Sequence, residues 1–428
     1  MGISSAMYSG VSGLNTNSQA MSVIGNNLAN TNTIGFKGSR TVFSDLLSST
    51  VFGSGGASQV GRGVGMSKVD SIFSQGTFES TETDTDLAIE GNGFFMLKEI
   101  GNNTTFYSRA GAFRFDEDGY LVNPEGLRVQ GKAFDPATGE LVAGDPTDIV
   151  VQNVGLIPAK VTDTLSLNSN LDASTVAIAA ATAFDPADTA TYNYAASTQT
   201  YDTLGNPHLV TTYFRKDAVA ANTWNWYWSA EDATGAALGN VAGDPPEGQI
   251  VFTADGLLDT TIAGNGTGAI AAGDLAWANG STDTGIDITF NTTQFNNVSK
   301  VISQDQNGYA SGNLTNVTIN NEGVVIASYS NGEQTQIANI TLAKFTNPNG
   351  LELVGSNLFL ASDNSGIPRI GLPGPELGKI FTNSLEQSNV DMGKEFVSMI
   401  TVQRGFQANS KIITTVDELL GELINLKR

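Results

Sequence analysis

The two ends of the chain carry apolar residues at a spacing of three and four, and this pattern constrains the fold more than any other feature. Near the start, Met7, Leu14, Met21 and Leu28 recur at sevens, with Ile24 between the last two. Such a narrow apolar stripe predicts an amphipathic helix whose stripe is covered by another helix. The stripe at the other end contains Met399, Val402, Phe406, Ile413, Val416, Leu420 and Leu423.

Polar and small residues interrupt both stripes. Asn17 and Asn409 each occupy a stripe position, where a polar side chain often sets the register or the oligomeric state at some cost in stability. Gly405 and Gly421 cost roughly 1 kcal/mol each within a helix, but they allow a neighbour to approach closely. The first segment is rich in Ser and Asn, which form helices poorly, so we expect it to need partners.

Two interpretations of the ends stay open at this point. The segments could form a two-helix hairpin packed on their own domain. Alternatively, residues 1–30 and 388–428 are a helical assembly domain that folds against other copies, because two thin stripes bury little surface alone. In either case the termini meet and the middle of the chain loops out between them.

The middle of the chain reads as β-structure in two blocks. "DLAIEGNGFFML" predicts a pair of hydrophobic strands, and "AFRFDEDGYLVNPEGLRVQG" alternates apolar and polar residues with turns at Asp118-Gly119 and Glu125-Gly126. Residues 304–361 alternate in the same way, so we expect 71–147 and 296–361 to form one discontinuous inner β domain.

An outer β domain is expected over 148–295, inserted into the first. Its alternating Trp224, Trp226 and Trp228 predict a strand with aromatic residues on one face. Residues 31–70 and 362–387 are then connecting segments, and the glycine-rich stretches at 53–56 and 61–65 favour a flexible linker. The predicted fold class is mixed and multidomain, with paired, coiled-coil-like terminal helices and two mainly antiparallel β domains.

Charge and composition exclude several classes of protein. The formal net charge is −22 and lies almost entirely between residues 79 and 385, which argues against nucleic-acid binding. The absence of cysteine excludes disulfides, cysteine-based zinc sites and thiol catalysis. We find neither the charged and apolar regions of a cleaved signal peptide nor an apolar run of membrane-spanning length. This pattern fits a cytoplasmic protein, and a non-classical export route would look the same.

No group of residues predicts catalysis, a cofactor or a metal. His208 is the one histidine, so a histidine-rich metal site is impossible. "DEDG" at 116–119 lacks the spacing of an EF-hand and favours a hairpin turn. The carboxylates of 81–86 lie in a polar, solvated segment, and the glycine-rich stretches do not complete a phosphate-binding motif. We therefore expect no enzyme.

Longer motifs add a resemblance to a known family. "NNLANTNTIGFK" and "QSNVDMGKEFVSMITVQRGFQANSKIITTVDELLGELINLKR" resemble the ends of bacterial flagellar axial proteins, the rod and hook subunits. "DTDLAIEGNGFFML", "RAGAFRFDEDGYLVNPEGLRVQG", "YDTLGNPHLVTTYF" and "LAKFTNPNGLELVGSNLF" are similar to the hook proteins in particular. The resemblance covers nearly the whole chain, apart from an Ala/Thr-rich stretch at 173–196 and residues 233–285.

The resemblance implies a structural subunit of the flagellar hook. Such subunits assemble into a curved, flexible tube, a universal joint that transmits motor torque to the filament and encloses the export channel. The implied partners are further copies, the distal rod, the hook cap, the hook–filament junction proteins and the flagellar type III export apparatus, and the implied location is outside the cell without a cleaved signal peptide. The alternatives are a distal rod subunit, or a surface adhesin that uses the tryptophan face and oligomerises through its ends.

The end of the first helix is expected to be an elbow. Asn and Thr side chains compete with helical hydrogen bonds and would end the helix near Asn30. We expect Gly35 to permit the bend, Phe36 to anchor it in an apolar surface, and Lys37 to be the first charge outside the stripe.

Overall fold

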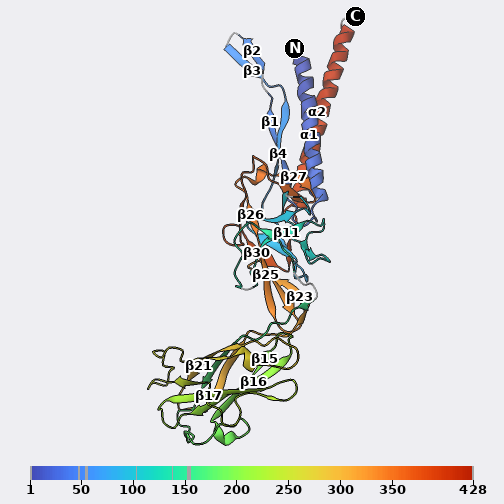
Figure 1. The fold of residues 1–428 in the computed structure, drawn as a ribbon. Helices are drawn as coiled ribbons and strands as arrows, with labels where there is room; N and C mark the ends of the chain where they lie inside the picture. The colour runs from blue at the N-terminus through green and yellow to red at the C-terminus, as the bar shows by residue number, and fades with distance from the viewer. Residues whose placement is uncertain are drawn as a thin grey trace. The chain divides into compact units, whose positions relative to one another are not determined.

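The computed structural model describes residues 2–46, 49–53, 56–102, 104–136, 138–151 and 156–426, and it describes no side chains for 2–4, 49–60 and 423–426. The chain divides into two compact units (Figure 1). Unit 1 contains residues 1–154, 316–327 and 335–428. Unit 2 contains residues 155–315 and 328–334.

Two helices of unit 1, α1 (Gly2–Ala29) and α2 (Met392–Leu426), lie side by side and run in opposite directions (Figure 1). The prediction of a helix at each end is confirmed. α1 stops at Ala29, and the Asn30 side chain donates to the carbonyl of Asn26 at 2.9 Å. α2 begins after Asp391, whose carboxylate accepts the N–H of Lys394 at 3.1 Å and so caps the first turn.

A hairpin follows α1. Strand β1 (Ser39–Asp45) pairs antiparallel with β4 (Val64–Ser71), and β2 (Ser49–Gly53) pairs with β3 (Gly56–Val60). The expected flexible linker is therefore wrong for these strands. Thr41, Val42 and Phe43 follow one another in β1, and such β-branched and aromatic residues favour an extended chain, whereas the predicted linker rested on the glycines nearby.

The β core of unit 1 is built around β7 (Phe94–Lys98), which pairs with β8 (Thr105–Ser108), β11 (Arg128–Ala133) and β26 (Leu342–Lys344). The expected pairing of β7 with β6 (Leu87–Glu90) is wrong, since β6 pairs with β30 (Lys379–Thr382). Both strands are continuous apolar runs that are buried along most of their length. Strands buried in this way need neighbours on both faces, and here those neighbours come from distant parts of the chain.

The predicted turns at Asp118-Gly119 and Glu125-Gly126 are confirmed. They join β9 (Arg114–Phe115) to β10 (Leu121–Val122), and β10 to β11. Both glycines have a positive φ, +83° and +85°, which such tight turns require. The remaining elements of unit 1 are β5 (Phe78–Ser80), β12 (Thr147–Asp148), the 3-10 turn η3 (Pro348–Gly350), β27 (Glu352–Gly355), β28 (Leu358–Leu360), β29 (Arg369–Gly371) and β31 (Ser384–Glu386). Three strands have residues in both units: β23 (Gly312–Ile319), β24 (Val324–Tyr329) and β25 (Gln334–Ile340).

Unit 2 contains two sheets around one apolar core. One sheet has the order β20 (Thr267–Ile270), β21 (Ile286–Thr293), β14 (Thr164–Asn170) and β22 (Lys300–Gln306). The other has the order β15 (Tyr194–Tyr201), β16 (Pro207–Lys216), β17 (Thr223–Glu231) and β18 (Ala237–Gly239), with β19 (Gly248–Val251) beside β17. The smaller elements are β13 (Leu156–Ile157), η1 (Thr189–Thr191) and η2 (Ala272–Asp274).

The tryptophan strand lies inside unit 2. Trp224, Trp226 and Trp228 are buried in the core together, as the alternation in β17 predicted. Residues 296–315, which we expected in the inner domain, lie in unit 2 because β22 pairs with β14. The Ala/Thr-rich stretch is part of this unit, and Arg215 on β16 donates to the carbonyls of Ala179 and Thr182 within it.

Candidate assembly site

The elbow after α1 is held against the last strand before α2. The N–H of Gly35 donates to the carbonyl of Glu386 at 2.7 Å. Gly35 has a φ of +68°, and a methyl group on it would lie 2.5 Å from the backbone nitrogen of Ala110. A side chain is excluded both by the left-handed backbone and by this contact, so the predicted need for glycine here has a direct steric basis.

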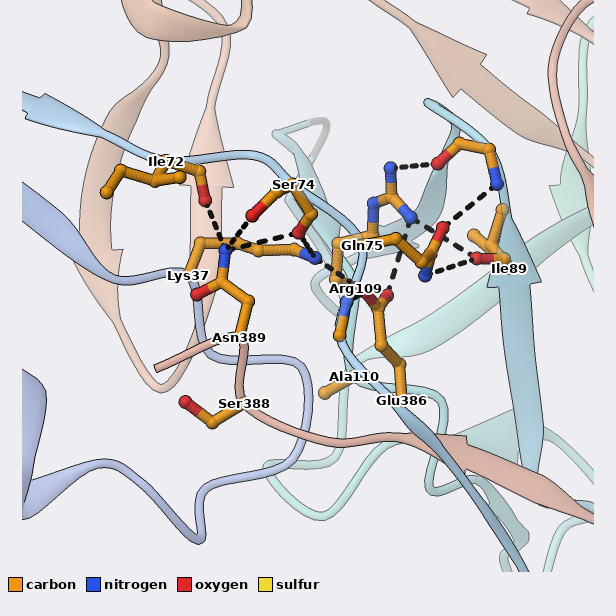
Figure 2. A network of polar contacts seen from close by, with 12 residues as sticks. Lys37, Ile72, Ser74, Gln75, Ile89, Arg109, Ala110, Glu386, Ser388 and Asn389 are labelled. Carbon is orange, nitrogen blue, oxygen red and sulfur yellow. Dashed lines mark hydrogen bonds and ion pairs between the residues drawn. The ribbon is translucent and has the colours of Figure 1, made fainter. Parts of the chain in front are cut away.

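A buried cluster of charges lies beside the elbow (Figure 2). The Lys37 ammonium lies 2.6 Å from Oε1 of Glu386, and the Arg109 guanidinium lies 3.4 Å from Oε2. All three side chains are at most 1% exposed. The backbone N–H of Gly76 also donates to Oε1, at 2.8 Å. One carboxylate from the C-terminal side therefore holds a lysine from the elbow and an arginine from the β core.

Carbonyl groups satisfy further donors of the two cations. Lys37 donates to the carbonyl of Ser74 at 2.9 Å, and Arg109 donates to the carbonyl of Gly91 at 2.6 Å. Burial lowers the pKa of Lys37, and Glu386 opposes this shift. Burial likewise lowers the pKa of Arg109 against the same carboxylate. The site thus depends on Glu386 to keep two buried cations stable.

Two asparagines complete the junction. The amide of Asn27, on α1, both accepts from and donates to the backbone of Ser39, at 2.9 and 2.7 Å. The amide of Asn389 accepts from the N–H of Gly38 at 2.8 Å and donates to the carbonyl of Ile72 at 2.6 Å. These contacts tie the start of the hairpin to both terminal segments. Local sequence patterns point to neither asparagine nor to Glu386, and they place Lys37 outside the stripe without identifying its partner.

The buried positions of α1 are mainly small and polar residues. They include Gly10 and Gly13, which lie against Ile413 and Asn409 of α2, and Thr16, Ala20 and Ile24. The predicted stripe residues Leu14, Met21 and Leu28 are only partly buried, and Met7 is 38% exposed. In the single chain, most of the large apolar residues of α1 are therefore left partly uncovered.

The second helix is even less covered. Val416 is buried, whereas Met399, Val402, Asn409 and Ile413 are partly buried. Phe406 is 41% exposed and Leu420 is 38% exposed. The side chain of Leu423 lies outside the described residues. Further large apolar residues of α2 are exposed in the chain: Met392, Phe396, Val397, Ile400, Ile412 and Leu419.

The remaining elbow residues lie within the chain's own structure. Phe36 is 7% exposed, so it is buried without any second copy. Asn30 ends α1, as described above. The roles that we assigned to the helix and elbow residues in assembly stay predictions.

Unit 2 holds the one histidine in a polar cluster. His208 stacks on Trp277, with ring centroids 3.8 Å apart, and its Nε2 lies 3.1 Å from the carboxylate of Asp202. Burial alone would raise the pKa of Asp202, but hydrogen bonds from Asn279, Asn206 and His208 outweigh it and lower this pKa to about 2. The cluster joins the turn before β16 to the loop that carries Asn279.

The described residues contain no group of three or more histidine, cysteine or carboxylate side chains placed to hold a metal ion. None of the described helices combines the length and apolar content that crossing a bilayer requires.

Comparison with known proteins decides the family. Models of four protein families match the chain: "Flagella basal body rod protein" at 7–37, "Flagellar hook protein FlgE/F/G D1 domain" at 88–178, "Flagellar basal body protein FlaE D2 domain" at 166–309, and "Flagellar basal body rod FlgEFG protein C-terminal" at 382–426. The flagellar hook protein FlgE of Borreliella burgdorferi is 38% identical over 449 residues, which cover 99% of each chain. The chain belongs to the flagellar hook protein family.

Other hook proteins are similar over the same extent. Flagellar hook protein FlgE of Escherichia coli is 36% identical and covers 99% of this chain and 100% of its own length. A crystal structure of the Helicobacter pylori flagellar hook protein FlgE2 matches with a TM-score of 0.50 at 15% identity, covering 72% of this chain and all of that one. The latter supports the fold, with a helix at each end and mostly β domains. The predicted identification as a hook subunit is confirmed.

Proposed function

We propose that the chain is a structural subunit, not an enzyme, that assembles with other copies into the curved, flexible tube of the flagellar hook. The observation that carries this proposal is the uncovered apolar surface of α1 and α2. Phe406, Leu420 and Met7 are exposed by about two fifths of their surface in the single chain. Neighbouring copies that cover these residues would contribute roughly 25 cal/mol for each Å² of apolar surface removed from water.

The helices belong at the inside of the tube in this proposal. Stripes of apolar residues that need cover from neighbours suit a coiled-coil-like inner layer around the export channel. Met7, Met21 and Met399 give this layer side chains that adapt to small shifts in packing. The tube could then bend as it turns and still transmit torque to the filament.

Unit 2 is proposed to be an outer domain inserted into the inner β domain. Nearly all of the net negative charge lies between the two terminal segments. Polar, hydrated contacts between such domains would exchange easily as the tube rotates. A chain without residues 155–315 should still polymerise, but into tubes of changed curvature and compressibility. Unchanged curvature and compressibility would contradict the proposed separate roles of the inner helices and the outer domain.

The junction at Glu386 is proposed to transmit load between the two layers. It fastens the end of α1, the start of α2 and the β core to one another through buried contacts, so a force on the helices reaches the β domain directly. Phe36 and Gly35 fix the direction in which the chain leaves α1. These roles rest on the burial and the contacts described above.

The family places the subunit in the flagellar hook. We propose that it is exported by the flagellar type III apparatus without a cleaved signal peptide and assembles outside the cell. Its proposed partners are further copies, the distal rod, the hook cap and the hook–filament junction proteins.

Electron microscopy of the polymerised full chain tests the proposal. Curved tubes are the expected result. Short straight tubes would favour the alternative, a distal rod subunit, and the absence of any ordered polymer would contradict assembly through the terminal helices.

A further inference from the structure

Both terminal helices carry the same short pattern, a glycine followed four residues later by an asparagine. The pairs are Gly13 with Asn17 on α1 and Gly405 with Asn409 on α2. In each pair the asparagine amide donates to the carbonyl of its own glycine, at 2.8 Å on α1 and 2.9 Å on α2. This bond holds each asparagine side chain along the surface of its own helix.

Each asparagine also packs on the glycine of the other helix. A methyl group added to Gly13 would lie 2.7 Å from the side chain of Asn409. A methyl group added to Gly405 would lie 3.2 Å from the side-chain oxygen of Asn17. Because the helices are antiparallel, the two contacts are reciprocal, and each glycine provides the space that the opposite asparagine fills.

We propose that Gly13, Asn17, Gly405 and Asn409, here called the Gly–Asn interlock, fix the register of α1 on α2. The proposal rests on the proposed function in one respect. A fixed register sets how the apolar residues left uncovered on the two helices are arranged, and these are the residues offered to neighbouring copies. The four residues are positioning residues for assembly.

The apolar stripes alone leave the register ambiguous. They repeat at about seven residues, so sliding one helix by seven residues, about 10 Å along the axis, again brings the same faces of the two helices together. The interlock does not survive such a slide. Counting along the antiparallel pair, Asn17 would face Ile412 or Ser398 in place of Gly405, and the space beside a glycine would be lost.

The asparagines also predict that the pair of helices holds together weakly on its own. Two amides at the centre of a helix interface bury little apolar surface, and polar groups at such positions lower stability while specifying one arrangement. The interlock therefore favours one register without making the pair stable in the absence of other copies.

Other glycines of the same helices serve as controls. A methyl group on Gly25 of α1 or on Gly421 of α2 would meet no atom within 4 Å. Alanine at these positions raises helix propensity without a steric cost. Their substitution separates the effect of the interlock from a general effect of glycine in a helix.

Polymerisation of full-length variants tests the pairing. We expect Gly13→Ala to lower the yield of polymer about tenfold, because the added methyl group overpacks the contact with Asn409. Adding Asn409→Ala should restore most of the yield, since its smaller side chain leaves room for the methyl group. Adding Asn17→Ala to Gly13→Ala should not restore the yield. Gly25→Ala alone should assemble like the unsubstituted chain.

The distance between a spin label on α1 and one on α2 measures the register directly. The chain has no cysteine, so Ser18→Cys and Thr401→Cys, both exposed positions, accept spin labels at these two sites alone. In polymers diluted with unlabelled subunits, the distance between the labels should be the same in the unsubstituted chain and in the Gly13→Ala, Asn409→Ala variant. A seven-residue slide would change the helix alignment by about 10 Å.

Three results would overturn the inference. They are normal assembly of Gly13→Ala, equal rescue by Asn17→Ala and Asn409→Ala, and the absence of rescue by either. A label distance in the unsubstituted polymer that does not match the register seen here would also overturn it. Failure of the unsubstituted chain to polymerise would instead contradict the proposed function.

Discussion

Replacement of Glu386 by glutamine should destabilise unit 1 strongly. The substitution keeps the shape of the side chain but removes the one carboxylate that contacts Lys37 and Arg109, whose side chains are each 1% exposed. Breaking a buried ion pair by removing one partner costs about 3–5 kcal/mol. Because two cations lose their partner here and repel each other, we expect a loss near the upper end of that range.

Removing one of the two cations should destabilise unit 1 less than removing the carboxylate. Lys37→Met removes one cation and leaves Glu386 paired with Arg109, so no uncompensated charge remains in the cluster. We expect Lys37→Met to cost clearly less stability than Glu386→Gln. The carboxylate stays buried, but Arg109 and the N–H of Gly76 still contact it. This order follows from the charge count of the cluster, with two cations around one anion.

The two units allow the effect to be measured with an internal control. All four tryptophans, Trp224, Trp226, Trp228 and Trp277, lie in unit 2, so the urea midpoint of tryptophan fluorescence should not change. Hydrogen exchange of the peptides covering 87–97 and 379–386 should accelerate in proportion to the loss of stability.

A matched control lies on the surface of the same unit. Glu376 contacts Arg369 at 2.6 Å, but both side chains are more than 60% exposed. Glu376→Gln should leave the exchange of unit 1 unchanged, because exposed ion pairs contribute little. Hydrogen exchange in Glu386→Gln that matches this control would contradict the importance of the buried carboxylate. Faster exchange in Lys37→Met than in Glu386→Gln would contradict the charge count of the cluster.

Three further predictions concern the elbow and unit 2. Gly35→Ala should destabilise unit 1 by more than about 2 kcal/mol in hydrogen exchange, since it adds a clash to a left-handed backbone, whereas Gly126→Ala, with the same backbone strain and open space, should cost only about 1–2 kcal/mol. Phe36→Ala should lower the stability of unit 1 by about 3–5 kcal/mol in the same assay, because the ring is buried. Unchanged exchange and assembly would contradict the anchoring role of Phe36. The lowered pKa of Asp202 contributes stability above the ordinary aspartate pKa that is lost as the pH falls from about 4 towards 2. Acid titration followed by tryptophan fluorescence should show this loss of stability. The loss should be absent in Asp202→Asn and present in Asp283→Asn, a control at an exposed aspartate of the same unit.

Local patterns predicted the elements of this fold that depend on local physics. The apolar spacing of the ends predicted two helices, and Asp118-Gly119 predicted a hairpin turn, both from residues that are neighbours in the sequence. The alternation around Trp226 identified a strand with a buried aromatic face for the same reason.

The parts that the sequence did not reveal depend on residues far apart in the chain. Lys37 and Glu386 are separated by 349 positions, and no spacing rule connects a lone lysine with a lone glutamate. The partner of β6 is β30, from the other end of unit 1, so local order wrongly paired it with β7. Asn17 and Asn409 were visible as interruptions of the stripes, but only the structure shows that each one packs on a glycine of the other helix.

Hydrogen exchange of the terminal helices, measured in the unpolymerised chain and in the polymer, tests whether these helices are assembly elements. We expect residues 5–29 and 392–422 to exchange rapidly in the single chain, because their apolar residues lack cover, and to become strongly protected in the polymer. Equal protection in both states would show that the two helices are a stable hairpin of the single chain, and it would contradict their role as assembly elements.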